Sequence, residues 1–272
     1  MSIVSTGWLS KNRSKVKIID SSWHMSGTNR DAYEEYKKEH IKNTIFFDID
    51  KSSNKKTELP HMLPNEKDWE KIVSNLGITN QDRIVVYDNS DVISSCRCWY
   101  TFIFFGHKPN LISVLDGGLL KWKKEKKETT SRTTKLEKKI YKAKKISNLV
   151  KTQNEINKNI LEKKFKVVDA RSKKRFLGLE KEPRPGLKSG SIENSYCLPF
   201  GELINTENKT FLEKNLIKEK FAEIGVNNEN NVVFSCGSGI TATVLSLAYS
   251  IINDKYLPIV YDGSWAEYGK IK

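Results

Sequence analysis

The chain has 272 residues, a length that allows one large domain or two domains of medium size. Its apolar fraction of 38%, with six tryptophans, ten tyrosines and eleven phenylalanines, is enough for a buried core and excludes a disordered chain. Its four cysteines are too few and too scattered for a disulfide framework, and no stretch approaches the ~20 apolar residues of a membrane helix. The first residues show no secretion signal. We therefore expect a folded cytoplasmic protein with no membrane partner.

Positive charge is concentrated in one part of the sequence. Much of the net charge of +14 comes from residues 121–145, where twelve Lys and Arg stand against three Glu. The aromatic residues there are Trp122 and Tyr141, which give no stacking platform for nucleic-acid bases. We interpret the stretch as a solvated basic segment and expect no nucleic-acid partner, although a surface that docks acidic partners remains an alternative.

An internal repeat defines the expected architecture. Three stretches of the first half recur in the second half, in the same order and at an offset near 148 positions: residues 16–20 and 166–169, 75–88 and 223–236, and 114–118 and 260–263. In the middle pair, Asp88 aligns with Cys236. A duplicated domain with one altered copy explains this pattern.

The repeated stretches also predict the fold class. They are short apolar runs rich in β-branched residues, which indicate buried strands, and segments with helical spacing such as 68–76 and 241–252 adjoin them. Strands that alternate with helices predict an α/β fold, in which each copy is a parallel sheet flanked by helices. We place the first copy at residues 1–134, a basic linker at 135–147 and the second copy at 148–272.

The active site is expected in the loops after the strands at 85–87 and 232–234, because ligands bind at the carboxyl ends of parallel strands. The second loop opens with Cys236 and the first with Asp88, so only the second copy offers a nucleophile there. Two glycines after Cys236 let main-chain N–H groups turn inward, and the helix that starts at Thr241 adds partial positive charge. Such a nest should stabilise a thiolate.

Three other interpretations of this loop stay open. Residues 237–242 satisfy the dinucleotide-binding pattern G-x-G-x-x-A, but only ten residues follow the acidic Asp262. A cysteine phosphatase needs an Arg that closes the loop, and no Arg occurs between Cys236 and Lys272. The third interpretation is a buried structural cysteine, against which the two glycines and the helix start argue.

Further motifs run along the whole chain in a fixed order. They are residues 22–23, 30–36, 40–41, 46–50, 59–64, 115–118, 175–178, 182–184, the Cys236 loop and 261–265. Together they resemble the tandem-domain rhodanese family, the mercaptopyruvate and thiosulfate sulfurtransferases. The resemblance implies two tandem rhodanese-like domains, of which only the second is catalytic. The loop Cys-Gly-Ser-Gly-Ile-Thr is similar to that of the mercaptopyruvate-preferring branch, because the thiosulfate branch tends to carry basic residues after the cysteine.

The resemblance also implies which residues bind the donor and carry its sulfur. Cys236 would accept the sulfur as a persulfide, and guanidinium forks would grip the donor carboxylate. The residues that would bind the donor are Arg175, Arg184, Gly237, Gly239, Ile240 and Thr241.

A proton relay is implied at Ser238, His61 and Asp50. His61 would be the acid and base, and Asp50 would fix its tautomer. His61 and Asp50 come from the first copy, so the site is expected between the domains. From the residues alone, His61 could equally be a loop histidine packed between apolar neighbours, and Ser238 a loop-stabilising hydroxyl.

The expected reaction is sulfur transfer from 3-mercaptopyruvate, a small anionic donor, to a thioredoxin-like protein, a small thiol or cyanide, with release of pyruvate. No cofactor and no metal are expected, and the protein should be a monomer or weak dimer. Thiosulfate:cyanide transfer by the same cysteine is the alternative enzyme activity. A non-catalytic sulfur carrier or scaffold is the alternative from another class.

Overall fold

The computed structural model describes residues 2–271, which form two compact units. Unit 1 consists of residues 2–54, 63–146 and 206–210, and unit 2 of residues 55–62, 147–205 and 211–271. Most of unit 1 thus precedes residue 147 and most of unit 2 follows it. Each unit also takes in one short segment from the other half of the sequence.

Unit 1 alternates strands and helices along its sequence. In chain order these are β1 (Ile3–Val4), α1 (Thr6–Asn12), β2 (Lys17–Asp20), α2 (Ala32–Lys38), β3 (His40–Ile41), β4 (Thr44–Phe46), α3 (Ile49–Ser52), α4 (Glu66–Asn75), β5 (Ile84–Tyr87), α5 (Ser95–Phe104), β6 (Ile112–Leu115), α6 (Gly118–Lys124) and β7 (Thr129–Thr130). Five of the strands form a parallel sheet in the order β1-β6-β5-β2-β4. Asp20 pairs with Tyr87 in the register, so the carboxyl ends of β2 and β5 meet at one edge.

Helices cover both faces of the unit 1 sheet. Leu9 of α1 and Trp122 of α6 are fully buried in one cluster with strand residues such as Val85. A separate aromatic cluster joins α4 to α5, where the Trp69 ring stacks on Phe105 with centroids 5.1 Å apart. Burial of these large side chains is the main stabilising contribution to a sheet of this kind.

The predicted basic linker contains no helix or strand before Ser147, which begins a short 3-10 helix, yet its main chain is fixed to unit 1. The N–H of Tyr141 donates to Ser74 Oγ over 3.1 Å, and that of Lys142 donates to Asn80 Oδ1 over 2.8 Å. The Tyr141 side chain is buried, while the lysines beside it are exposed. The segment is therefore a strap along unit 1 with a solvated basic surface.

Unit 2 repeats this arrangement. Its elements are β8 (Val150–Lys151), α7 (Gln153–Glu162), β9 (Lys166–Asp169), α8 (Lys173–Phe176), β10 (Tyr196–Cys197), α9 (Lys214–Glu223), β11 (Val232–Ser235), α10 (Ala242–Ile252), β12 (Val260–Tyr261) and α11 (Ser264–Tyr268). The parallel sheet has the order β10-β9-β11-β12-β8, which matches unit 1 strand for strand. The duplication inferred from the sequence is thus a duplication of one sheet topology.

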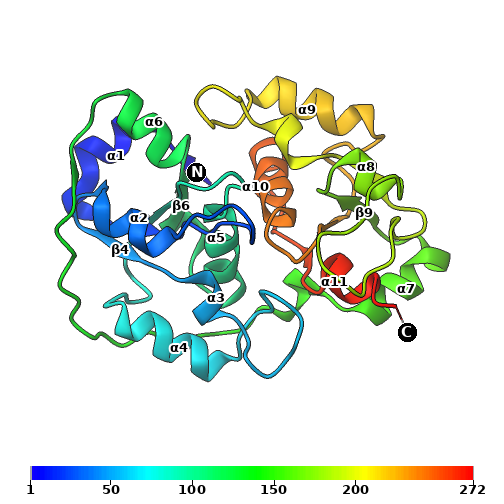
Figure 1. Ribbon diagram of the computed structural model, residues 1–272, viewed down its shortest axis with the longest axis horizontal. Helices are drawn as coiled ribbons and strands as arrows, with labels where there is room; N and C mark the ends of the chain where they lie inside the picture. Colours follow the sequence, from blue (N-terminus) through cyan, green and yellow to red (C-terminus); the bar gives the residue numbers. More distant parts are fainter. Residues whose placement is uncertain (1, 272) are drawn as a thin grey trace. The chain divides into compact units, whose positions relative to one another are not determined.

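The unit 2 sheet is also covered on both faces, with α9 and α10 on one side and α7 and α11 on the other (Figure 1). Val233 packs with Trp265 of α11, whereas the next residue, Phe234, meets Tyr249 of α10 edge-on with centroids 5.9 Å apart. Successive strand residues point to opposite faces of the sheet. Because helices cover both faces, every residue of a central strand such as β11 is buried, and the strand needs a continuous apolar run. The predicted α/β class is confirmed in both units.

The predicted helices at 68–76 and 241–252 are close to the observed α4 and α10. Helix α4 begins two residues earlier than predicted, because Asn65 caps it by accepting the N–H of Asp68. Among the described residues, no helix is long and apolar enough to cross a membrane.

Candidate active site

The loop after β11 holds Cys236 at the carboxyl edge of the unit 2 sheet. Its side chain is buried, and the N–H groups of Ser238 and Gly239 donate to Sγ over 3.4 and 3.1 Å. Gly239 has a φ of +78°, a left-handed conformation that glycine adopts without strain. Two main-chain dipoles thus point at the sulfur from the turn before α10, an arrangement that favours the thiolate.

The main chain of Cys236 is fixed by the start of α11. Its N–H donates to Ser264 Oγ over 3.1 Å, and the Ser264 hydroxyl donates in turn to the carbonyl of Tyr261 over 2.8 Å. Its carbonyl accepts the N–H of Trp265 over 2.9 Å. Sequence reasoning missed Ser264. The available signal was its place after Gly263, where the aligned residue of the first copy is Gly118.

Ser238 and His61 lie together, as the relay requires. Nδ1 of His61 is 2.9 Å from Ser238 Oγ, and both side chains are buried. His61 has a φ of +59°, a strained conformation for a residue with a side chain. Sequence position assigned His61 to the first copy, but residues 55–62 are part of unit 2, where Glu58 pairs with Lys270 over 3.9 Å.

Asp50 lies in unit 1 on the short helix α3, beside the indole of Trp23. Nε1 of Trp23 donates to Asp50 Oδ2 over 3.0 Å. Because Asp50 and His61 belong to different units, their pairing stays a prediction.

Arg175 and Arg184 both approach the loop at Gly237. A Cβ placed on Gly237 would lie 3.1 Å from Nη2 of Arg175 and 3.7 Å from Nη1 of Arg184. Nη2 of Arg184 also donates to Ser238 Oγ over 3.4 Å. Gly237 itself has no positive φ, so its absent side chain matters here because it leaves room for the guanidinium groups.

Ile240 and Thr241 connect the loop to α10. Ile240 is buried, and its carbonyl accepts the Thr243 hydroxyl over 2.6 Å. Thr241 precedes the first helical residue, so the helix starts one position later than predicted. The contact of Ile240 and Thr241 with the donor stays a prediction.

Sequence reasoning also missed a buried ion-pair network behind the loop. Arg171 Nη2 lies 2.7 Å from Asp169 Oδ2, and its Nη1 lies 2.7 Å from Glu182 Oε1. Glu182 Oε2 also pairs with Arg175 Nη2 over 2.6 Å. Burial lowers the pKa of Arg171, but the charges of Asp169 and Glu182 raise it overall above its usual value. An Asp-x-Arg sequence at the end of a strand was the available signal.

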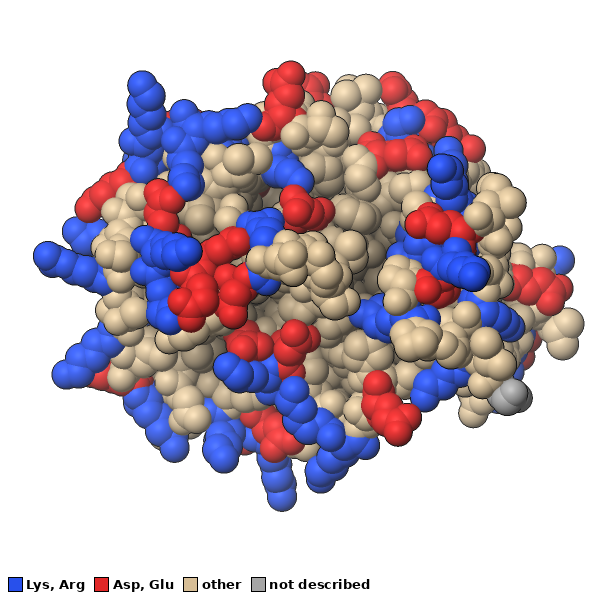
Figure 2. Space-filling model, in the orientation of Figure 1, with Lys and Arg blue, Asp and Glu red and all other residues tan. Residues whose placement is uncertain are grey.

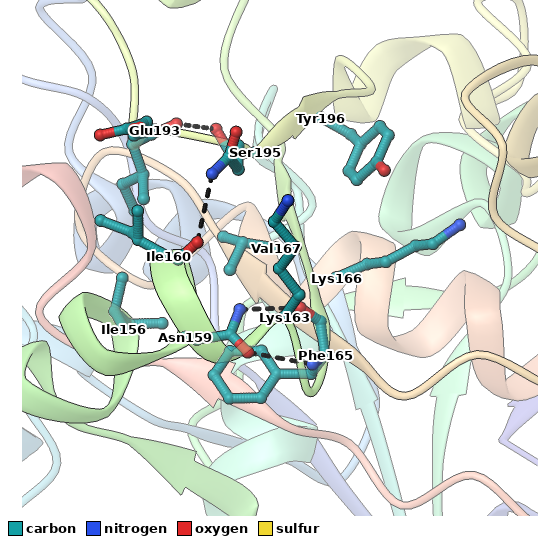
Figure 3. A pocket seen from close by; sticks show the side chains of 12 residues that line it. Ile156, Asn159, Ile160, Lys163, Phe165, Lys166, Val167, Glu193, Ser195 and Tyr196 are labelled. Atoms are coloured by element: carbon teal, nitrogen blue, oxygen red, sulfur yellow. Dashed lines mark hydrogen bonds between the residues drawn. The ribbon is translucent and has the colours of Figure 1, made fainter.

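A pocket of about 370 Å³ lies at the other end of β9. Figure 3 shows the side chains of Lys163 and Lys166 beside it, with Asn159 bonded to the main chain of Phe165. Lys166 is at the amino end of the strand, whereas the Cys236 loop follows the carboxyl ends, so this pocket is not part of the site. Within residues 2–271, no cluster of three or more His, Cys, Asp or Glu could hold a metal ion.

Comparisons with known proteins show the family to which the chain belongs. The family model for the rhodanese-like domain matches residues 5–125 and 152–270. "Thiosulfate/3-mercaptopyruvate sulfurtransferase 1, mitochondrial" of Arabidopsis thaliana is 35% identical over 98% of this chain and 75% of its own length. The 3-mercaptopyruvate sulfurtransferase of Mus musculus is 34% identical over 98% of this chain and 91% of its own length.

Solved structures give the same result. The crystal structure of the 3-mercaptopyruvate sulfurtransferase SseA from Escherichia coli superimposes with a TM-score of 0.87 at 27% identity, over 98% of this chain and all of that one. The resemblance inferred from the sequence motifs is therefore confirmed. The chain belongs to the tandem-domain rhodanese family of thiosulfate and 3-mercaptopyruvate sulfurtransferases.

Proposed function

We propose that the chain moves sulfur from 3-mercaptopyruvate to a thiol acceptor or cyanide through a persulfide on Cys236. The observation that carries this proposal is the Sγ atom of Cys236, which accepts two main-chain N–H groups within 3.4 Å in a loop that two arginines approach. The thiolate attacks the donor sulfur, the S–S bond forms and the C–S bond breaks. The electron pair goes to carbon as the enolate of pyruvate, which must then gain a proton.

The arginines orient the donor for this attack. A carboxylate accepts two N–H groups from one guanidinium fork, which fixes both its distance and its angle. With its carboxylate held by Arg175 and Arg184, the donor would present its sulfur to Cys236. The loop N–H groups stabilise the thiolate before the attack and bind the persulfide sulfur after it, while the negative charge passes to the enolate.

His61 and Ser238 would supply the proton to the enolate. The 2.9 Å contact between His61 Nδ1 and Ser238 Oγ lets a proton pass from the ring through the hydroxyl. Asp50 would hold the other ring nitrogen and so select the tautomer. In this proposal residues 148–272 form the catalytic domain and residues 1–134 the domain without a nucleophile.

The choice of donor depends on charge, because thiosulfate could use the same cysteine. A dianion such as thiosulfate profits from cations next to the thiolate, but Gly237 and Ser238 supply none. The name of the Arabidopsis relative includes both donors. Comparing kcat/KM for the two donors decides between them, and a clear preference for thiosulfate would refute our choice.

The acceptor and location are proposed on chemical grounds. A thioredoxin-like protein or a small thiol could attack the outer sulfur of the persulfide in a reducing cytoplasm. Figure 2 shows basic side chains interspersed with acidic ones on the face drawn, and Lys121, Lys123 and Lys127 of the basic segment form ion pairs with glutamates. This mixture favours a solvated surface over a nucleic-acid or scaffold site.

Mass spectrometry of the intact protein tests the proposal directly. After treatment with 3-mercaptopyruvate, the chain should gain one sulfur, and the gain should disappear in Cys236→Ala. Sulfur on another cysteine, or none at all, would refute it.

A further inference from the structure

Glu182 holds one of the two arginines of the site in place. Its carboxylate accepts Arg175 Nε and Nη2 over 3.2 and 2.6 Å, so it binds one side of the guanidinium fork. Arg175 Nη2 is also the atom nearest to the position of a Gly237 Cβ. The Glu182 side chain is only 2% exposed, so water screens its charge little. The orientation and the effective charge of Arg175 therefore both depend on Glu182.

Arg171 cannot replace this interaction. Its Nε and Nη2 donate to Asp169, its Nη1 donates to Glu182, and its guanidinium carbon lies 4.4 Å from the centre of the Trp265 ring. Nη2 of Arg171 also donates to the carbonyl of Gly190 over 2.8 Å. Arg171 thus completes the support on the far side of Glu182, whereas Arg175 extends from Glu182 to the loop.

The ionic side chains of this group leave one net positive charge. Arg171, Arg175 and Arg184 contribute three positive charges, and Asp169 and Glu182 contribute two negative ones. A donor that brings one carboxylate therefore meets one positive charge in excess and a correctly placed fork. A donor that brings two charges in one compact group meets no excess positive charge to offset the second.

We infer that Glu182 is a positioning residue that aims Arg175 at the donor carboxylate and also sets the donor preference, because its charge disfavours dianions. The inference rests on the proposed function. It adds that preference for a monocarboxylate depends on a buried acid outside the loop, and not only on the absence of cations within it.

Substitution of Glu182 by Gln tests the charge at nearly constant shape. In Glu182→Gln, the NH₂ group of the new amide cannot accept an N–H of Arg175, so kcat/KM for 3-mercaptopyruvate should fall. Because the site gains one positive charge, the ratio of kcat/KM for thiosulfate to that for 3-mercaptopyruvate should rise about tenfold. Glu182→Asp keeps the charge and should leave this ratio near the wild-type value. If Glu182→Gln lowers both activities equally, the inference is overturned.

The matched control is Glu180→Gln. Glu180 is exposed in the same segment and accepts the Ser172 hydroxyl at 3.4 Å, so its loss should leave the donor ratio unchanged. A second readout needs no reaction. In Cys236→Ala protein, calorimetry should show that Glu182→Gln lowers the Kd of sulfate relative to the Kd of pyruvate by about tenfold. An unchanged anion ratio overturns the inference even if persulfide forms. Failure of the wild-type protein to form persulfide overturns the proposed function instead, whatever the anion ratio shows.

Discussion

The loops after β5 and β11 hold the same kind of cradle around different side chains. In unit 1, Asp88 accepts the N–H of Ser90 on Oδ1 and that of Ser95 on Oδ2, each over 2.9 Å. In unit 2, the sulfur of Cys236 accepts the two N–H groups of its own loop. The fold thus supplies an anion nest in both copies. The first residue of the loop decides whether that nest binds a fixed carboxylate or a nucleophile.

The arginines beside the two loops differ in the same way. In unit 1, Arg30 donates to Glu35 Oε1 over 2.7 Å and to the carbonyl of Asn89 over 2.9 Å, so the loop itself takes up this guanidinium. In unit 2, Glu182 binds one side of Arg175, and the guanidinium lies over Gly237. Both copies pair an arginine with a glutamate. In unit 2 the paired arginine, Arg175, is directed at Gly237, a loop residue that has no side chain.

The largest expected effect comes from making the second loop resemble the first. In Cys236→Asp, the carboxylate should accept the loop N–H groups as Asp88 does, so the fold should survive. Sulfur transfer should fall by at least about 10³-fold, because no nucleophile remains. Thermal unfolding and the rate of pyruvate release measure the two halves of this prediction.

Two further variants test whether a cysteine elsewhere in the chain can carry the sulfur. Cys197→Ser should keep full activity, since Cys197 lies on β10 and burial raises the pKa of its thiol to about 11.

Asp88→Cys should not acquire sulfur from the donor, because Arg30 is already bonded to Glu35 and to the loop. A persulfide on the new cysteine would show that the nest alone is sufficient.

The next largest effect on activity is expected from the arginines that lie over the Cys236 loop. Arg184→Ala removes one donor-binding fork, and a charge-assisted bond of this kind contributes about 1.5–3 kcal/mol. KM for 3-mercaptopyruvate should therefore rise about 10- to 100-fold, with a smaller change in kcat. Arg184→Lys should recover only part of the loss, because an ammonium group lacks the fork. A fall in kcat at constant KM would place Arg184 in the chemical step instead.

The sequence predicted the parallel sheets and the Cys236 nest, because strands, glycines and a helix start are local patterns. It could not predict that residues 55–62 join unit 2, since that depends on contacts far apart in the sequence. The support from Glu182 and Ser264 was missed for the same reason. A buried glutamate between two arginines, or a serine hydroxyl on the main chain of Cys236, has no periodic signature.

A third difference lies at the ends of β2 and β9, where Asp20 and Asp169 occupy aligned positions. Asp169 pairs with Arg171, but Asp20 accepts neutral donors from Ser22, and burial raises its pKa from 3.8 to about 7. The folded state thus binds more protons than the unfolded state between these values. The stability that protonated Asp20 contributes is present below about pH 4 and is lost as the pH rises to about 7.

Asp20→Asn should remove this dependence. The free energy of unfolding of the wild type should fall by about 3 kcal/mol more than that of the variant as the pH rises from about 4.5 to about 7.5. Thermal or denaturant unfolding at the two pH values measures the difference. Parallel curves for the two proteins would mean that Asp20 titrates normally in the fold.

Among the variants that should lower activity, the smallest effect is expected at the turn that supports Cys236. Ser264 has a φ of +48°, which is unfavourable for a residue with a side chain, and the aligned Gly118 has a φ of +52°. A Cβ at Gly118 would collide with the carbonyl of Asp88, so the first copy requires glycine there. Unit 2 keeps a strained serine whose hydroxyl accepts the N–H of Cys236, which indicates that the strain is retained to hold the loop.

Replacing Ser264 separates the strain from the hydrogen bond. Ser264→Ala keeps the strain and loses the hydroxyl, so kcat should fall about three- to tenfold at nearly constant KM, as expected for loss of one neutral hydrogen bond. Ser264→Gly relieves the strain and should unfold at a higher temperature than Ser264→Ala, with no recovery of kcat. If the glycine variant regains both stability and kcat, the hydroxyl has no positioning role and the turn conformation alone holds Cys236.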